Sequence, residues 1–375
     1  MKICVLKESL PDEARVAAVP DTVTRYKGEG HEVCIESGAG LRAGFRDSAY
    51  VEQGATIADS AKAACEGADV VLCVRRPPAD VIAALPEGVA LVGLLDPFNL
   101  DDALADLNKR RLSAFALEWA PRITRAQSID ALSSQSNLAG YRAALEGAHL
   151  YGRAMPMMMT AAGTVSPAKV FVMGAGVAGL QAIATARRLG AVVTATDVRP
   201  AAKEQVESLG AKFIAVEDEE FQAAETAGGY AKEMSDEYKA KQAELTATHI
   251  AKQDIVITTA LIPGRPAPVL ISPDMVETMH PGSVIVDMAV AQGGNCPLSK
   301  PDEIVEHAGV IVAGFANLPA KVATDASSLY ARNIHNFLPL VTDENGDLNL
   351  DTDDEIVSAM LLTRGGETVN ERLTS

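Results

Sequence analysis

The sequence predicts an α/β protein of two doubly wound domains, each a largely parallel sheet covered by helices, with a cleft between the domains. Short apolar runs alternate with amphipathic stretches along nearly all of the 375 residues, a rhythm typical of βαβ units. This length corresponds to about two domains. Aromatic residues make up only 4% of the chain, and the abundant Ala, Val, Gly and Leu let helices lie close on a sheet.

The composition excludes several classes of protein. A hydrophobic fraction of 48% and a charged fraction of 22% are typical of a globular chain rather than a disordered one. The formal net charge of −17 disfavours a nucleic-acid partner or an anionic membrane surface, because polyanions repel it. An anionic ligand remains compatible with this charge, since local backbone amides can bind it. With no apolar stretch of spanning length and no signal peptide in the first residues, we expect a cytoplasmic protein.

The cysteine and histidine patterns predict no metal site. The five cysteines are scattered, and Cys4, Cys34 and Cys73 lie in apolar, strand-like runs. We interpret them as buried free thiols in a reducing compartment, with a zinc or disulfide role as the minor alternative. The six histidines show none of the spacings of metal motifs.

The first domain is predicted to comprise residues 1–130 plus 321–375. Its five expected strands are bounded by Gly, Pro or charged residues, and are Lys2–Leu6, His31–Ile35, Val70–Val74, Val89–Leu95 and Ser113–Glu118. Helical patterns lie between them at Ser60–Glu66 and Asp101–Asn108. We expect the tail of the chain to return onto this domain, because five strands alone leave one face of the sheet half covered.

The second domain is predicted at residues 131–320, and a helical stretch, Asn137–Leu150, leads into it. The apolar segment Met155–Met159 follows, as either a dimer contact or core filler. Six strands are expected, the number in a complete dinucleotide-binding fold: Lys169–Met173, Ala191–Thr196, Lys212–Val216, Asp254–Thr259, Val284–Asp287 and Val310–Ala313. A glycine-bearing insertion between the third and fourth strands is typical of a lid or a loop.

The strongest motif in the chain is Gly174-Ala175-Gly176-Val177-Ala178-Gly179. It follows an apolar strand and opens an apolar helix that Gly190 ends, which is the context of a Rossmann-like nucleotide site. We expect a tight turn at Gly174, a bare backbone at Gly176 that a pyrophosphate can approach, and close helix packing at Gly179. A glycine turn without a ligand is the weaker interpretation.

Asp197 follows the next strand, 18 residues past Gly179, near the spacing of about 20 that dinucleotide sites show. Its carboxylate can accept hydrogen bonds from both adenosine ribose hydroxyls and repels a 2′-phosphate, which favours NAD(H) over NADP(H). Arg199 could attract that phosphate, but the acid at the strand end is the more decisive group. Val198 lies between them in the same predicted binding turn.

Three segments together resemble the alanine dehydrogenase and transhydrogenase family: the glycine motif with Asp197, Pro121–Gln135 and Val286–Gly294. The resemblance spans essentially the whole chain and is closest to the NAD(H)-binding subunits of bacterial proton-translocating transhydrogenases. It implies a Re/Si-specific NAD(P)+ transhydrogenase. In such an enzyme hydride passes between NAD(H) on this chain and NADP(H) on a partner subunit, coupled to proton movement through a membrane-spanning subunit. It also implies a homodimer held at the inner face of the cell membrane by these partners.

The resemblance also implies residue roles. Gln127 and Asp130 match the family's catalytic loop, and with Arg122 and Ser133 they would hold the nicotinamide and its ribose, Gln127 also reaching the NADP(H) partner. Amide, carboxylate and hydroxyl groups suit a carboxamide and ribose hydroxyls. Without the resemblance, this segment also fits a polar interdomain linker.

The remaining implied contacts belong to the rest of the nucleotide. Gly229 and Tyr230 match a lid whose glycines allow closure, although a plain loop is about as good an interpretation of Tyr230 alone. The predicted nucleotide contacts outside the catalytic loop are Gly174, Ala175, Gly176, Val177, Gly179, Asp197, Val198, Arg199, Gly229, Tyr230, Ala260 and Leu261.

The chain departs from the dehydrogenase half of the family. Where alanine dehydrogenases carry a catalytic His, a catalytic Asp and a substrate-binding Lys, this sequence has Asp96, Ala291 and Arg75, although their carboxylate-binding Arg is kept as Arg15. Oxidising an amino acid needs a base, whereas direct hydride passage between two nicotinamide rings needs proximity and exclusion of water. We therefore favour a transhydrogenase over two alternatives, an amino-acid dehydrogenase and a non-catalytic NAD-binding module.

Overall fold

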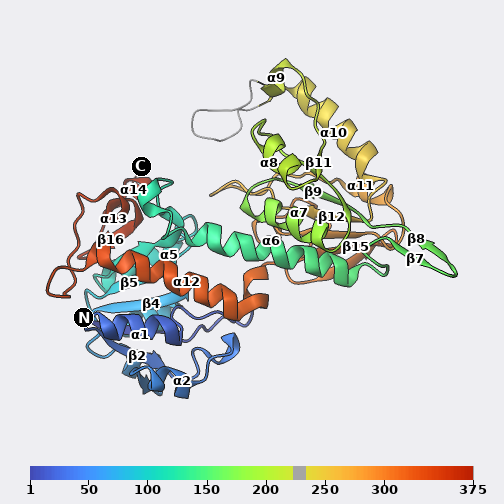
Figure 1. Cartoon of the computed structure of the whole chain (residues 1–375). Helices are drawn as coiled ribbons and strands as arrows, with labels where there is room; N and C mark the ends of the chain where they lie inside the picture. Colours follow the sequence, from blue (N-terminus) through green and yellow to red (C-terminus); the bar gives the residue numbers. More distant parts are fainter. Residues whose placement is uncertain (223–233, 375) are drawn as a thin grey trace. The chain divides into compact units, whose positions relative to one another are not determined.

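The computed structural model describes residues 1–222 and 234–374 (Figure 1). Over these residues the chain folds into two compact units, residues 1–135 with the chain from 319 onward, and residues 136–318. The division lies inside the helix α6 (Ala131–Leu150), whereas the sequence-based boundary falls just before it. At 20 residues α6 is the longest helix described, and no described helix has the length and apolarity to cross a bilayer.

The described residues of the first unit contain a sheet ordered β17-β16-β6-β5-β4-β1-β2-β3. Its strands are β1 (Lys2–Val5), β2 (Glu32–Glu36), β3 (Thr56–Ala58), β4 (Val70–Arg75), β5 (Ala90–Leu94), β6 (Ser113–Ala116), β16 (Leu361–Arg364) and β17 (Glu367–Thr368). Strands β1 to β6 are parallel in the 3-2-1-4-5-6 order of a doubly wound fold. Five of them were expected; β3 was missed because it is short and lacks a buried apolar run.

Helices cover both faces of this sheet, and the alternation of side chains decides which residues meet which helix. Ile3 and Val5 belong to the core that includes α1 and α12, whereas Cys4 between them belongs to the core of α3, α4 and α5. The helices are α1 (Pro20–Gly28), α2 (Asp47–Glu52), α3 (Ala61–Cys65), α4 (Ala79–Ala84), α5 (Asp101–Lys109), α12 (Ala323–Phe337), α13 (Glu355–Met360) and α14 (Glu371–Thr374).

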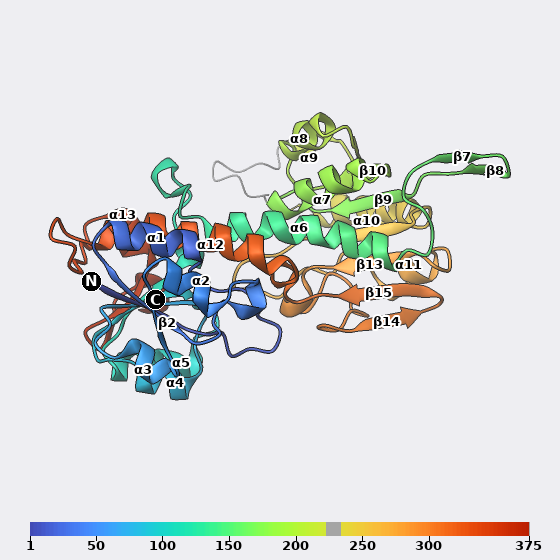
Figure 2. The ribbon, with the colours of Figure 1, turned by 60° about the horizontal axis from the view of Figure 1, so that its bottom comes forward.

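The tail of the chain returns to this unit in two ways. Helix α12 lies beside α1 and packs on the sheet, as Figures 1 and 2 show. Strand β16 also pairs antiparallel with β6 and so lengthens the sheet, which the sequence did not predict. Covering a half-exposed face was therefore only one of the reasons for the return.

The second unit repeats the same strand order with one addition. In its described residues the sheet is ordered β11-β10-β9-β12-β13-β15-β14. Its strands are β9 (Lys169–Met173), β10 (Val192–Thr196), β11 (Lys212–Phe213), β12 (Ile255–Thr258), β13 (Val284–Asp287), β14 (Ile304–His307) and β15 (Val310–Gly314). The six expected strands are present, β11 being shorter than expected, and β14 adds an antiparallel edge. The predicted α/β class with Rossmann-like parallel sheets is confirmed.

The helices of the second unit form a layer on each face of the sheet. Residues of α6, α7 (Val177–Arg188) and α8 (Ala202–Ser208) share one core with Val170 and Val172 of β9. On the other face, α10 (Asp236–Ile250) and α11 (Pro273–Glu277) share a core with Phe171 and Met173. The short helix α9 (Glu219–Gln222) precedes the residues that are not described.

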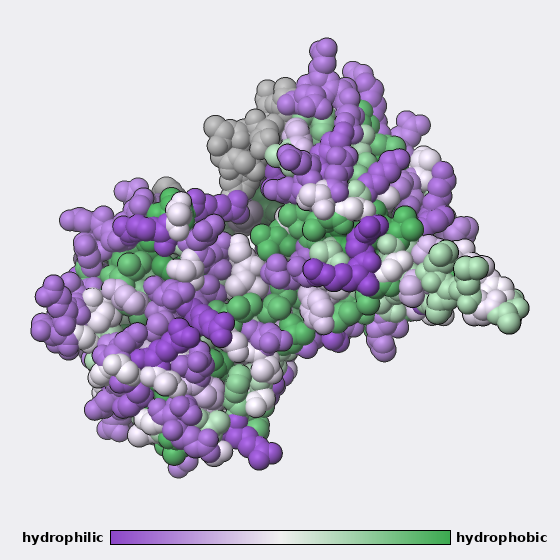
Figure 3. Space-filling model, in the orientation of Figure 1, coloured by the Kyte–Doolittle hydropathy of each residue, from purple (hydrophilic) through white to green (hydrophobic). Residues whose placement is uncertain are grey.

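The methionine-rich segment forms an arm rather than core. Strands β7 (Met158–Thr160) and β8 (Gly163–Val165) make an antiparallel hairpin that extends away from the sheet of its unit (Figure 2). Met157, Met158 and Met159 are 60, 42 and 81% exposed, and the hairpin shows as an apolar projection in Figure 3. The core-filler interpretation is therefore wrong for these three residues, while Met155 is buried.

Candidate functional site

The strand order of the second unit reverses between β9 and β12, and doubly wound proteins bind ligands at such a reversal, outside the carboxyl ends of the strands. The glycine motif directly follows β9, and Ala260 and Leu261 come shortly after β12. The two loops are joined, because Thr259 Oγ1 donates a hydrogen bond to the Gly174 carbonyl oxygen at 3.1 Å. The structure therefore brings both predicted segments to one sheet edge.

Each glycine of the motif has a distinct geometric reason. Gly174 has φ +102°, and a Cβ there would lie 2.4 Å from Thr259 Oγ1. A Cβ on Gly179 would lie 1.8 Å from the Gly174 carbonyl oxygen, so α7 can pack this closely only with glycine. A Cβ on Gly176 would meet nothing within 4 Å, and no side chain caps the start of α7 there. Open space in front of a helix N-terminus suits a pyrophosphate.

Asp197 is hydrogen-bonded from several sides. One carboxylate oxygen accepts from the Ala175 backbone nitrogen at 2.7 Å and from Arg199 Nη2 at 3.0 Å. The other accepts from the Arg199 backbone nitrogen and its Nε, both at 2.9 Å. Asp197 thus ties the end of β10 to the glycine loop, with the partly exposed Arg199 side chain over it. A ribose bound here would have to share the carboxylate with Arg199.

Exposed apolar side chains flank these polar groups. Val177, Val198 and Leu261 are all exposed, as an adenine-binding surface requires before its ligand arrives. The loop after β12 is held by the buried Asn295, whose Nδ2 donates to the Ala260 carbonyl oxygen at 2.9 Å and whose Oδ1 accepts from the Ala260 nitrogen at 3.1 Å. Sequence reasoning missed Asn295; its position directly after the Gly293-Gly294 turn was the available signal.

The buried acid at the end of β13 is occupied by its own unit. Asp287 accepts hydrogen bonds from Thr258 Oγ1, the Ala289 and Cys296 backbone nitrogens and Ser299 Oγ, at 2.6 to 3.1 Å. These four partners shape the Gln292-Gly293-Gly294 turn. Asp287 is therefore a positioning residue of the sheet edge rather than a base directed at a substrate.

The predicted catalytic loop lies in the first unit. Ala126 and Ile129 are buried and anchor it, while Arg122 and Gln127 are exposed. Asp130 caps α6: its Oδ1 accepts from the Ser133 backbone nitrogen at 2.8 Å and its Oδ2 from Ser133 Oγ at 2.5 Å. Two predicted site residues thus form a helix cap, which sequence reasoning did not foresee.

Helix α12 holds this loop from the far end of the chain. The buried Asn333 donates from Nδ2 to the Ser128 carbonyl oxygen at 2.9 Å and accepts from Ser134 Oγ at 2.7 Å. Asn336, exposed one turn later, donates to the same carbonyl at 3.1 Å. Sequence reasoning missed both residues, because the pairs are about two hundred positions apart and leave no local pattern.

The first unit has a strand reversal of its own, between β1 and β4, but two glutamates occupy the carboxyl ends of its strands. Glu8 accepts from the Val74 and Arg75 nitrogens at 2.6 and 3.1 Å, and Glu118 accepts from the Leu95 and Asp96 nitrogens at 3.2 and 2.7 Å. Burial raises the pKa of each carboxyl to about 7. Of the two reversals, the one in the second unit is thus the one with open backbone amides.

The remaining predictions fall outside this geometry. Gly229 and Tyr230, the predicted lid, lie outside the described residues. The described residues contain no group of three or more metal-ligating side chains, and the five cysteines are free and buried.

Comparison with protein families agrees with this architecture. Residues 4–139 match the family model described as "Alanine dehydrogenase/PNT, N-terminal domain", and residues 143–371 match that of the C-terminal domain. The chain belongs to the alanine dehydrogenase/PNT family. The resemblance inferred from the motifs is confirmed.

Within this family the chain is more similar to transhydrogenase subunits than to dehydrogenases. It is 55% identical to the first of the polypeptides that make up NAD(P) transhydrogenase subunit alpha of Rhodospirillum rubrum, over 100% of this chain and 99% of that protein. A crystal structure of transhydrogenase from Sinorhizobium meliloti superposes with a TM-score of 0.90 at 51% identity, covering 98% of this chain and 100% of that one. An L-alanine dehydrogenase structure gives a TM-score of 0.82 at 28% identity, covering 100% and 98%.

The positions at which dehydrogenases of the alanine dehydrogenase/PNT family carry catalytic groups have no base here. Asp96 is exposed at φ +53°, where its carboxylate accepts from Asn99 Nδ2 at 3.1 Å, and Ala291 is exposed. Arg15 is buried, with its Nε donating to Glu13 Oε1 at 2.7 Å and its Nη1 to Gln135 Oε1 at 2.8 Å. Its guanidinium serves the interior of the first unit.

Proposed function

We propose that this chain is the NAD(H)-binding component of a proton-translocating, Re/Si-specific transhydrogenase. It exchanges hydride directly with NADP(H) on a partner subunit, and a membrane-spanning subunit couples this exchange to proton movement. The observation that carries the proposal is a contrast. The nucleotide edge of the second unit is open at Gly176, while Asp96 and Ala291 stand where a dehydrogenase has its catalytic His and Asp.

Named residues would hold each portion of the nucleotide. The first-turn amides of α7 would bind the phosphates at Gly176, and Asp197 would accept from the adenosine ribose hydroxyls. Adenine would lie against Val198 and Leu261, which are exposed and apolar. The nicotinamide ring supplies or accepts the hydride when the nucleotide is bound.

The catalytic-loop residues would orient the nicotinamide. Gln127 is exposed, and within the described residues its side chain makes no hydrogen bond, so its amide is available to the carboxamide and to the NADP(H) partner. Asp130 is already bonded to Ser133, but each carboxylate oxygen keeps a second lone pair for a ribose hydroxyl. No step at these residues requires a proton to move.

Isotope labelling tests the proposal. NADPH carrying deuterium at C4, mixed with NAD+, this chain and an NADP(H)-binding partner domain, should yield NADH that retains the deuterium in ordinary water. Gln127→Asn should lower the transfer rate at least about tenfold while NADH affinity changes less than about threefold, because it withdraws a group that orients the ring. Gln53→Asn, the same change elsewhere on the first unit, is the matched control and should leave both unchanged.

Other outcomes would support other functions. Alanine-dependent reduction of NAD+ by the isolated chain would make it an amino-acid dehydrogenase. NADH binding without transfer at any ratio of partner would leave a nucleotide-binding module. Equal losses of transfer in Gln127→Asn and Gln53→Asn would contradict the role of the loop.

We further propose that the chain is a homodimer joined through the β7–β8 hairpin, and that partner subunits hold it at the inner face of the cell membrane. The three exposed methionines of the hairpin support the dimer, since an arm of this kind gains stability only by burying apolar surface. Replacing Met157, Met158 and Met159 by Ser should convert the dimer to a monomer in light-scattering measurements, with its thermal unfolding still cooperative. A variant that remains dimeric would place the interface elsewhere.

A further inference from the structure

The second unit has a cavity of about 410 Å³ on the edge of its sheet opposite the nucleotide edge. It lies at the amino ends of β9, β10 and β11 and is completed by the end of α10. The lining includes Lys169, Lys212 and Lys252 and no acidic residue. In a chain with a net charge of −17, three lysines around one cavity are a local reversal of charge.

Strand register explains why these side chains gather. Lys169 is paired with Val192 across β9 and β10, and Thr194 is paired with Lys212 across β10 and β11. Since side chains alternate along a strand, these four residues share the face of Phe171, which α10 covers. Because α10 ends at Ile250, the starts of the strands extend past it. Val192 is left 51% exposed between the lysines.

A hydrogen-bonded group forms one wall of the cavity. His249 Nε2 lies 2.8 Å from Thr194 Oγ1 and 3.2 Å from Gln253 Nε2, and Gln253 is only 4% exposed. An amide nitrogen can only donate, so His249 Nε2 accepts and the ring carries its proton on Nδ1. Burial, together with the charges of Lys252 and Lys212, lowers the pKa of His249, which confirms that both ammonium groups act on this wall.

The acid nearest in sequence does not neutralise the lysines. Asp254 accepts from the Lys169 backbone nitrogen at 2.8 Å, and its charge also acts on the Tyr151 hydroxyl. Within the described residues, none of the three lysines forms an ion pair. The cavity therefore combines three uncompensated positive charges with an apolar floor of Val192, Ile214 and Pro167.

We propose that this cavity binds a small phosphomonoester with an apolar body, at a site separate from the nucleotide edge. A phosphomonoester carries a charge of about −1.5 to −2 at pH 7, which three ammonium groups can balance. Lysines suit it as mobile point charges, and the apolar floor receives the organic portion. Inorganic phosphate would satisfy only the lysines, and an uncharged aromatic alcohol only the floor.

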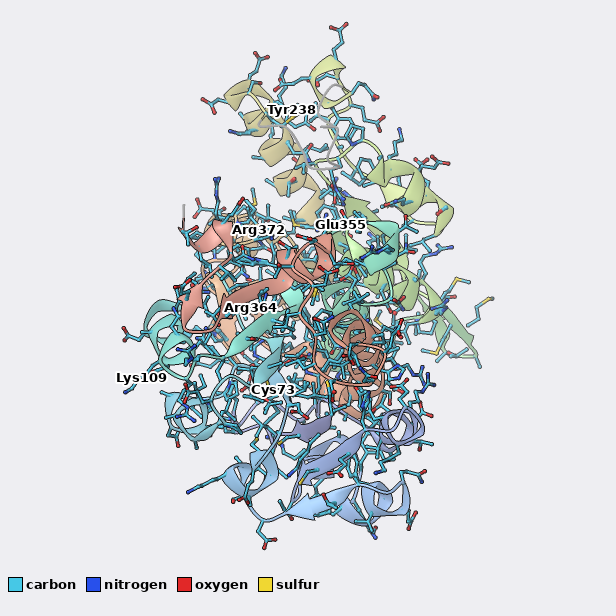
Figure 4. The ribbon with its side chains drawn as sticks, turned by 90° about the vertical axis from the view of Figure 1, so that its left-hand side faces the viewer. Cys73, Lys109, Tyr238, Glu355, Arg364 and Arg372 are labelled. Atoms are coloured by element: carbon cyan, nitrogen blue, oxygen red, sulfur yellow. The ribbon has the colours of Figure 1, made fainter. Side chains whose placement is uncertain are left out.

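The test uses phenyl phosphate, inorganic phosphate and benzyl alcohol as probes, with the NMR signals of the His249 ring as the reporter. Phenyl phosphate should shift these signals in a saturable way and raise the pKa of His249, because an anion offsets the nearby lysines. Its affinity should exceed that of inorganic phosphate at least about tenfold, and benzyl alcohol should not saturate. Lys212→Gln and Lys252→Gln should each weaken binding about threefold or more, whereas Lys109→Gln, an equal charge change at an exposed site on α5 (Figure 4), should not.

Two results would overturn the site. One is phenyl phosphate affinity unchanged in the Lys212→Gln/Lys252→Gln double variant, with its thermal unfolding intact; if that variant does not fold, unchanged affinity in both single variants decides equally. The other is displacement of phenyl phosphate from His249 by NADH, which would assign the binding to the nucleotide edge. The His249 signals report on the cavity itself, so failure of the chain to bind NADH would leave this test valid.

Discussion

The Asp197 carboxylate accepts a hydrogen bond from the backbone nitrogen of Ala175 at 2.7 Å. The residue expected to select the nucleotide therefore also holds the loop expected to bind its phosphates. Substitution at Asp197 thus acts both on nucleotide preference and on the order of the glycine loop.

Asp197→Asn should weaken NADH binding about tenfold and improve NADPH binding relative to NADH. The amide keeps the size of the side chain but removes the negative charge, so charge-assisted hydrogen bonds are lost and repulsion of a 2′-phosphate ends. Arg199 would also lose its ionic partner. Fluorescence titrations with both reduced nucleotides measure this, with the exposed Asp236→Asn as control. An unchanged preference would show that Asp197 acts on the loop alone.

Two glycines of one motif should respond to alanine in opposite ways. Gly176→Ala should change the free energy of unfolding by less than about 1 kcal/mol yet weaken NADH binding at least about tenfold, because its Cβ meets no protein atom and would fill the space for phosphate. Gly179→Ala should cost about 2 kcal/mol or more, because its Cβ would overlap the Gly174 carbonyl oxygen. Urea unfolding and NADH titration of both variants give the comparison. A stable Gly176→Ala with normal affinity would show that no phosphate approaches that backbone.

Asn333→Ala should destabilise the first unit and loosen the loop that carries Gln127. It leaves the Ser134 hydroxyl without its acceptor and removes a buried donor from the Ser128 carbonyl, at a cost of about 1–3 kcal/mol. Asn336→Ala removes an exposed donor to the same carbonyl and should cost less than about 1 kcal/mol. Urea unfolding measures the cost, and faster tryptic cleavage after Arg122 and Arg125 reports on the loop. Equal cleavage rates in both variants would argue against Asn333 as the anchor.

The unfolding free energy should carry the signature of Glu118. Burial raises the pKa of this carboxyl from 4.5 to about 7, so between these values the folded state binds more protons than the unfolded state. The contribution of Glu118 to stability is thus largest below pH 4.5 and is lost as pH rises to about 7. Compared with Glu118→Gln, which does not titrate, the parent protein should lose about 1–3 kcal/mol between pH 5 and pH 8. Urea unfolding at several pH values measures this difference; parallel curves for the two proteins would contradict the raised pKa.

Local sequence was enough for features that depend on neighbouring residues. The strands of both units are short apolar runs because both faces of a parallel sheet are buried, and such runs are visible without any partner. The glycine motif was equally visible, since the turn at Gly174 and the start of α7 are set within six residues. These elements also carry the open phosphate edge.

Features that depend on distant partners were not visible. Strand β16 exists because it pairs with β6, about 250 positions earlier, and Asn333 matters because Ser128 lies against it. The pairing of Asp130 with Ser133 is close in the chain, yet only the start of α6 made it a helix cap rather than two free polar groups.

The amino-acid sequence by itself determined the class of fold, the place of the nucleotide edge and the absence of a dehydrogenase's catalytic His and Asp, because apolar periodicity, glycine conformation and residue type are local properties. Only the tertiary structure decided that Arg15 serves the interior, that the methionines form an exposed arm and that three lysines from separate segments surround one cavity. Burial and pairing arise between segments that meet only when the chain is folded, so no local pattern contains them.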